Sequence, residues 1–178
     1  AYDIPLRLVG SEMCIRDRGI FISSNTSPLI NINNNNISGL ASISLGNING
    51  IQTVSSGTAT QTVNIFKNKI CDIVNNGVVT AQWATGIFVT GSGTGATVNV
   101  HTNLISNLRA PNGTGQNNVN GLTFNSSAGT INASFNTVYL DAVMNGGGGA
   151  NAVYSNIGST QTFLNNIFYN NSTIASGA

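Results

Sequence analysis

The chain has 178 residues, of which 40% are hydrophobic and only 6% are charged, with 6 Lys and Arg residues against 5 Asp and Glu residues. So few cationic side chains exclude an extended nucleic-acid surface, because phosphate contacts need clustered Lys and Arg. No apolar run approaches the ~20 residues of a membrane-spanning helix, and the many Ile, Val and Phe residues exclude a disordered chain.

The charged residues are concentrated at the N-terminus. Beyond residue 18 the charged side chains are Lys67, Lys69, Asp72, Arg109 and Asp141. The stretch "LVGSEMCIRDR" (residues 8–18) has neither the order of a secretory signal nor the sustained stripe of an amphipathic helix. It resembles the conceptual translation of a transposase sequencing adapter. We therefore expect residues 1–18 to lie outside the fold and residues 19–178 to form one domain.

Short groups of alternating apolar and polar residues follow. Examples are "TVNIF", "GIFVT", "TVNVH" and "GLTF", and clusters of Gly, Asn and Ser separate them. This alternation has the period of half-buried strands, and the clusters between them are typical of turns. Convincing helical stretches are absent, so the sequence predicts an all-β fold.

Five segments repeat one pattern, in which an apolar-polar-apolar group is followed by Asn, one further residue and an aliphatic. The shared positions are spaced by 33, 35, 33 and 29 residues and are Asn35, Asn68, Asn103, Asn136 and Asn165. A second element precedes four of them and reads "GIQTV", "GIFVT", "GLTF" and, as a variant, "AVYS". Repeats of this length that cannot bury a face alone predict coils stacked on one another.

Stacked parallel coils place equivalent residues one above another, about 4.8 Å apart. One predicted interior column contains Ile51, Ile87, Leu122 and Val153. A second combines Val63, Val98 and Ile131 with Ile65, Val100 and Ala133. A third contains Ile37, Ile70, Ile105, Val138 and Ile167.

The repeated Asn residues are predicted to form a hydrogen-bonded ladder at a bend, because an amide both donates and accepts and Asn tolerates the left-handed backbone region. The alternative interpretation is that Asn is merely common in these loops. It leaves the aliphatic two positions later unexplained.

The pattern "G-I-x-V … N-x-I" resembles the right-handed parallel β-helix repeat proteins, over roughly residues 28–171. The segment from "FNTVYLD" to "YNNST" is similar to large secreted repeat proteins of Gram-negative bacterial surfaces. The resemblance implies a parallel β-solenoid of about five repeats and an extracellular or cell-surface location. Surplus residues in "VVTAQWAT", "RAPNGTGQNNVN" and "MNGGGGAN" predict loops on one side, where binding would reside.

Many proteins of this fold cleave or bind acidic polysaccharides, and such chemistry needs paired acids or carboxylates around calcium. Only Asp72 and Asp141 are available after residue 18, two repeats and at least about 10 Å apart, and we interpret both as solvated or turn-capping. His101 has no partner at metal-ligand spacing, and Cys71 aligns with Ser106 and Tyr139 as an ordinary strand residue. We expect no catalytic centre, no metal and no cofactor.

Outward aromatics are the candidate ligand-binding residues, because rings along a groove can lie against sugar faces. Phe88 and Tyr154 are predicted to share one register, Tyr139 and Phe168 another, and Trp83 lies in a loop. The alternative is that these rings cover neighbouring strands. An ice- or mineral-binding face would need Thr-x-Thr ranks, and "TAT" at residues 58–60 does not recur in register.

The sequence therefore predicts a non-catalytic fragment of a secreted or cell-surface protein that acts as a structural stalk or an adhesion scaffold. The alternative is a polysaccharide-binding or lyase-like domain whose acidic site lies outside this fragment. Expected partners are polysaccharide or other cell-surface components and further coils of the same full-length chain, with no nucleic acid and no membrane insertion. Because "NNSTIASGA" follows a repeat without a polar cap, we expect the isolated chain to aggregate or fray.

Overall fold

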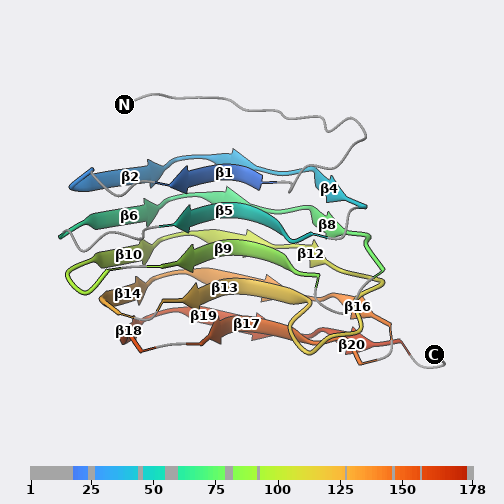
Figure 1. The fold of residues 1–178 in the computed structure, drawn as a ribbon. Helices are drawn as coiled ribbons and strands as arrows, with labels where there is room; N and C mark the ends of the chain where they lie inside the picture. The colour runs from blue at the N-terminus through green and yellow to red at the C-terminus, as the bar shows by residue number, and fades with distance from the viewer. Residues whose placement is uncertain are drawn as a thin grey trace.

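A computed structural model describes residues 18–23, 27–43, 46–54, 60–78, 82–91, 93–126, 128–145, 147–156 and 158–175. Every regular element in these ranges is a β-strand, and all strand pairs between successive passes of the chain are parallel. The predicted all-β parallel β-solenoid is thus confirmed (Figure 1). No helix in the described part of the chain is long and apolar enough to span a bilayer.

Each pass of the chain, here called a coil, contributes one strand to each side of the solenoid. The first sheet contains β1 (Arg18–Ser23), β5 (Ile48–Val54), β9 (Ala84–Thr90), β13 (Val119–Asn125) and β17 (Ala150–Ser155). The second sheet contains β2 (Leu29–Asn33), β6 (Thr62–Phe66), β10 (Thr97–His101), β14 (Thr130–Ser134) and β18 (Thr160–Leu164).

The other two sides are built from shorter strands. The third sheet contains β3 (Asn36–Ile37), β7 (Lys69–Ile70), β11 (Leu104–Ser106), β15 (Thr137–Leu140) and β19 (Ile167–Asn170). The fourth side contains the sheet of β4 (Leu40–Ser42), β8 (Ile73–Asn75) and β12 (Leu108–Arg109), and the pair of β16 (Val143–Met144) and β20 (Thr173–Ile174).

β1 begins at Arg18, the last residue of the stretch that resembles an adapter, and the Arg18 guanidinium carbon lies 4.1 Å from the centre of the Phe21 ring. Residues 1–17 lie outside the described residues, so the interpretation of that stretch stays a prediction.

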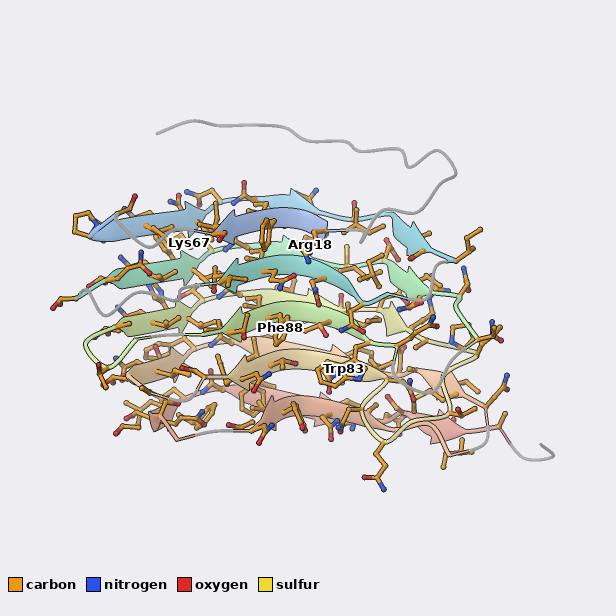
Figure 2. All side chains as sticks on the ribbon, in the orientation of Figure 1. Arg18, Lys67, Trp83 and Phe88 are labelled. Carbon is orange, nitrogen blue, oxygen red and sulfur yellow. The ribbon has the colours of Figure 1, made fainter. Side chains whose placement is uncertain are left out.

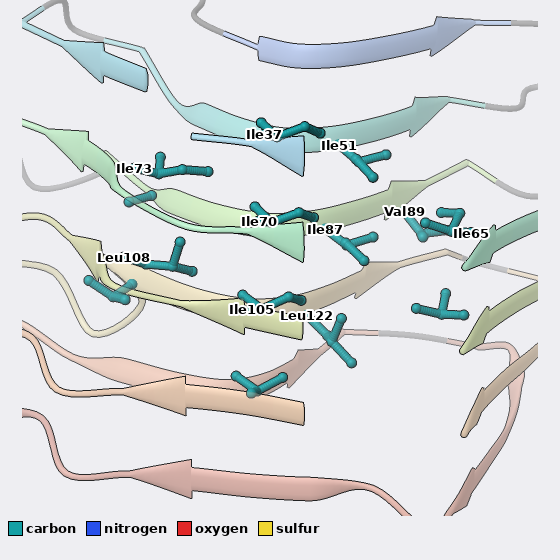
Figure 3. Close-up of a cluster of buried hydrophobic side chains, with 14 of the residues drawn as sticks. Ile37, Ile51, Ile65, Ile70, Ile73, Ile87, Val89, Ile105, Leu108 and Leu122 are labelled. Atoms are coloured by element: carbon teal, nitrogen blue, oxygen red, sulfur yellow. The ribbon is translucent and has the colours of Figure 1, made fainter. Parts of the chain in front are cut away.

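Most of the predicted columns are found in the interior, and Figure 3 shows members of each together with Ile73, Val89 and Leu108, which the sequence did not assign to a column. Ile51 pairs with Ile87, and Leu122 with both Ile87 and Val153, so the first predicted column is confirmed. The second predicted column is also in register, and Ile30 and Ile32 of β2 extend it. Burying such side chains contributes roughly 1.5–3 kcal/mol each, which favours one compact stack.

The third column is correct for its first four members and wrong for its last. Ile70 pairs with Ile37 and Ile105, and Ile105 with Val138, but Val138 pairs with Phe168. Ile167 pairs with Thr137 and is 64% exposed. The last repeat was therefore aligned one residue too early.

The glycine of the "G-I-x-V" element has a steric cause. A Cβ added at Gly86 would lie 2.6 Å from Cγ2 of Ile105 and 2.7 Å from the carbonyl oxygen of Gly121. Gly50 and Gly121 have the same environment in their own coils. The first sheet approaches the third-sheet column too closely at this level to accept a side chain.

The corner between the second and third sheets has two residues in every coil, namely 34–35, 67–68, 102–103, 135–136 and 165–166. The first residue of each pair has a positive φ, and these residues are Asn34, Lys67, Thr102, Phe135 and Asn165. The second residue is an Asn, which donates to the next coil at Asn35, Asn68, Asn103 and Asn136 and to the preceding coil at Asn166. The left-handed residue thus bends the chain from the second sheet into the third, and the Asn that follows fixes the corner.

The predicted ladder of amides is confirmed, with one correction. The Nδ2 groups of Asn35, Asn68 and Asn103 donate to Oδ1 of the following coil's Asn at 2.9–3.0 Å. Asn136 continues the ladder to Oδ1 of Asn166 at 3.0 Å, not to Asn165. Asn165 itself occupies the left-handed position, with φ 53°. The ladder residue and the left-handed residue are therefore different, although the sequence assigned both roles to one Asn.

Connections of unequal length lie at two other corners. Segments 76–83, 110–118 and 145–149 all join the fourth side to the first sheet, so the three surplus segments lie at one corner as predicted. They hydrogen-bond to one another, since the Gly149 N–H donates to the carbonyl of Gly115 at 2.9 Å and Nδ2 of Asn112 to that of Asn76 at 2.9 Å. The connection between the first and second sheets also varies in length, which the sequence did not reveal.

Candidate functional site

Three aromatic rings gather on the outer side of the first sheet. Phe88 and Tyr154 both pair with Thr123, from opposite sides, so they share the register that the sequence predicts. The Trp83 ring centre lies 6.3 Å from that of Phe88 and 5.7 Å from that of Tyr154, both edge to face. Figure 2 shows Trp83 and Phe88 on this side of the molecule. We call Trp83, Phe88 and Tyr154 the aromatic patch.

The backbone of Trp83 is held on both sides. Its N–H donates to Oδ1 of Asn47 at 3.0 Å, and its carbonyl accepts from the N–H of Ile48 at 2.9 Å and from Nδ2 of Asn75 at 3.2 Å. Edge-to-face contacts between aromatic rings contribute about 0.5–1.5 kcal/mol each beyond the area they bury. The backbone of Trp83 is therefore fixed by Asn47, Ile48 and Asn75, and its indole packs against the other two rings.

Polar side chains lie on the same side of the first sheet. Thr85 and Thr123 are fully buried, and neither hydroxyl has a hydrogen-bond partner among protein atoms; Oδ1 of buried Asn49 is likewise unpaired. Nδ2 of Asn49 donates to Oε1 of Gln52 at 3.1 Å. Unpaired buried polar groups are uncommon and call for a physical account, such as a bound water or ligand group.

An amide cluster lies beside these residues. Nδ2 of Asn151 donates to Oδ1 of Asn120 at 3.0 Å and to Oδ1 of Asn117 at 3.1 Å, and Nδ2 of Asn120 donates to the carbonyl of Asn117 at 2.8 Å. The first sheet thus combines half-buried rings with oriented amides on one side.

The second predicted aromatic pair is wrong in one member. Tyr139 pairs with Tyr169, and their rings stack at 5.3 Å with an interplanar angle of 6°; they are 42% and 52% exposed. Phe168 continues the interior column in register with Val138, is 39% exposed in this last coil, and has its ring centre 6.5 Å from that of Phe163. This correction has the same cause as those of Asn165 and Ile167, a shift of one residue in the last repeat.

The acidic residues and His101 lie apart from one another. Asp72 follows β7 with φ 54° and accepts a hydrogen bond from Nδ2 of Asn107, whereas Asp141 is exposed after β15. His101 stacks on Phe66 at 4.9 Å with an angle of 12°, and its Nδ1 lies 3.3 Å from Oγ1 of Thr102. No group of three His, Cys, Asp or Glu residues in the described ranges could hold a metal ion.

Cys71 follows β7, and its N–H donates to the carbonyl of Ile37 at 2.9 Å. Burial raises the pKa of its thiol above the usual value, and the neighbouring Asp72 carboxylate raises the pKa further. The protonated thiol is a poor nucleophile. This environment suits a strand residue better than a reactive one.

No family model matches the chain, and neither curated proteins nor solved structures give a match to it.

Sequence reasoning missed the polar partners of the aromatic patch. Gln52, Phe88, Thr123 and Tyr154 each follow the aliphatic residue of the "G-I-x-V" element, so they occupy equivalent outward positions. The signal was available in that alignment, and Phe21 of β1 occupies the same rank. The approach of Trp83 to this rank depends on a loop and carries no periodic signal.

Proposed function

We propose that this chain is a non-catalytic module of a secreted or cell-surface repeat protein and acts as an adhesion or interaction scaffold. The observation that carries the proposal is the ladder from Asn35 to Asn166, which links successive coils at one corner and is buried over most of its length. A solenoid held in this way is a rigid, extended body that presents its outer faces and loops to partners.

The test uses the full-length protein in the cells that produce it. Protease treatment of intact cells should remove the coils from the surface, while a cytoplasmic marker protein stays uncut. Coils that stay protected in intact cells and are digested only after lysis would contradict the proposal.

A second candidate function, polysaccharide binding, is favoured by the aromatic patch. Half-buried rings next to oriented amides suit a sugar, because its C–H face packs on a ring and its hydroxyl groups pair with amides. The unpaired hydroxyls of Thr85 and Thr123 add further polar groups to the strands that carry the patch.

Affinity electrophoresis in gels that contain neutral or acidic polysaccharide tests this function. Trp83→Ala and Tyr154→Ala should abolish retardation, whereas Tyr139→Ala, which removes an exposed ring on the third sheet, should retain it. Equal retardation of all three variants would exclude the aromatic patch, and release of new reducing ends would show an enzyme instead of a scaffold.

A further inference from the structure

The outer face of the second sheet carries a two-dimensional array of small polar groups. Thr62, Thr97, Thr130 and Thr160 are paired in sequence along one rank. Asn31, Asn64, Asn99 and Asn132 form a second rank two residues further along each strand, and Thr162 ends it. The motif is thus Leu-x-Asn in the first coil, Thr-x-Asn in the next three and Thr-x-Thr in the last. Two residues further along the strands a third rank follows, made of Asn33, Phe66, His101, Ser134 and Leu164.

The second rank is fixed by its own hydrogen bonds. Nδ2 of Asn64 donates to Oδ1 of Asn31 at 2.8 Å, that of Asn99 to Asn64 at 2.8 Å, and that of Asn132 to Asn99 at 2.9 Å. An amide has two donor hydrogens and two acceptor lone pairs, so each of these groups keeps bonding capacity directed outward. The rank therefore presents donors and acceptors at fixed positions before any ligand binds.

The face is nearly free of charge. Figure 1 shows β2, β6, β10, β14 and β18 stacked one above another. Their sequences contain no Asp, Glu, Lys or Arg, and His101 is the one ionisable side chain among them. A surface made of ions would be met by carboxylates or cations, which this face does not offer.

The spacing of the array matches that of ordered water. Parallel strands repeat about every 4.8 Å, and residues two apart along a strand are about 6.6 Å apart. Tetrahedral hydrogen bonds of about 2.75 Å place second-neighbour oxygens in ice about 4.5 Å apart and repeat about every 7.4 Å along the hexagonal axis. The strand repeat of about 4.8 Å is close to the second-neighbour distance of about 4.5 Å in ice. The spacing of about 6.6 Å along a strand is shorter than the axial repeat of about 7.4 Å, and side-chain rotamers can absorb this difference.

We propose that the outer face of the second sheet is an ice-binding surface. Threonine hydroxyls and asparagine amides form the hydrogen bonds, and the threonine methyl groups fill the spaces between ordered waters. A soluble sugar chain fits this face less well, because among its described residues the aromatic contact is the Phe66–His101 stack at the end of the strands. The proposal concerns a different sheet from the aromatic patch and does not depend on sugar binding.

The experiment measures thermal hysteresis and the uptake of a fluorescently labelled chain into a growing ice hemisphere. The unchanged chain should show both effects. Thr97→Tyr, which places a bulky ring in the middle of the array, should lose both, whereas Thr137→Tyr on the outer face of the third sheet should retain both. Circular dichroism and melting temperature establish that both variants keep the solenoid.

Two results would overturn the proposal. One is a folded, unchanged chain that shows no hysteresis and is excluded from ice. The other is equal activity of the Thr97→Tyr and Thr137→Tyr variants. Sedimentation with cellulose or chitin powder, lost in Thr97→Tyr and without an effect on ice, would assign the face to crystalline polysaccharide instead.

Discussion

Asn103 donates two hydrogen bonds to one oxygen of Asn136. Its Nδ2 group lies 3.0 Å from Oδ1 of Asn136, and its backbone nitrogen lies 3.1 Å from the same atom. Nδ2 of Asn103 also donates to the carbonyl of Ile65 at 2.9 Å, and Asn68 donates in the same way to Oδ1 of Asn103. One buried amide therefore connects three coils.

Replacing the Asn103 side chain should lower the free energy of unfolding. Asn103→Ala removes the acceptor of two donors on Asn68, a residue that is only 2% exposed. Because buried donors left without partners cost about 1–3 kcal/mol each, we expect a loss of about 3 kcal/mol in the free energy of unfolding, measured by urea denaturation. Asn99→Ala, in the partly exposed outer rank, is the matched control and should cost less than about 1 kcal/mol. Similar losses for both variants would contradict the assigned role of the inner ladder.

The positive φ of Phe135 predicts that glycine at this position stabilises the fold. Phe135 has φ 55° and is 60% exposed, so its side chain gives little in return for an unfavourable backbone conformation. Phe135→Gly should raise the free energy of unfolding by about 0.5–1 kcal/mol, because glycine adopts positive φ without steric cost. Phe135→Ala keeps the steric cost and serves as the control. A gain as large with alanine would show that the exposed ring, and not the backbone, is unfavourable.

The close packing around Gly86 predicts that adding a side chain there strongly lowers the free energy of unfolding. Gly86→Ala places a Cβ 2.6 Å from Ile105 and 2.7 Å from a backbone carbonyl, so the two sheets must separate. Overpacking of this kind costs typically 1–3 kcal/mol, and we expect about 3 kcal/mol because one of the neighbours is backbone. At Gly95 the nearest atom to an added Cβ is 3.3 Å away, so Gly95→Ala should melt close to the unchanged chain. Equal melting temperatures for Gly86→Ala and the unchanged chain would show that the sheets have more room than the structure gives.

The raised pKa of Cys71 predicts slow alkylation and a pH-dependent stability. A thiol whose pKa is higher in the folded than in the unfolded chain favours folding below the unfolded pKa. This contribution is lost as the pH rises through the folded value. In a Cys14→Ser background, the rate of reaction with iodoacetamide should rise at higher pH in the folded chain than in the chain unfolded by urea. Coincident profiles would show that Cys71 is fully solvated.

The sequence predicted the coil order and most of the columns because stacking in register makes like residues coincide. It failed where two neighbours could each play the same part. The segment "TFLNNIFYN" offers both Asn165 and Asn166, and the choice of the first also displaced Ile167 and Phe168. Strand pairing resolves the choice, because Leu164 pairs with Ser134 and leaves Asn166 opposite Asn136.

The outer surfaces were harder to predict than the interior. The sequence offers "TAT" at residues 58–60, of which 58 and 59 lie outside the described residues. The two ranks on the second sheet instead contain the threonines from Thr62 onward and Asn in the second position. Trp83 reaches Tyr154 from a connecting segment, and such approaches depend on loop conformation. Periodicity reports which side of a strand is buried, but it does not report what a loop places over the other side.

The corner between the second and third sheets has the same length in every coil, whereas the connections that lead into the first sheet differ in length. We therefore expect insertions to be tolerated in those connections and not at that corner. A peptide grafted into residues 110–118 would enlarge the rim at that corner, while the neighbouring strands β12 and β13 keep their partners. The same peptide grafted between Thr102 and Asn103 would interrupt the Asn ladder, which connects neighbouring coils. The solenoid is therefore suited to display inserts on one edge at heights set by the strand repeat.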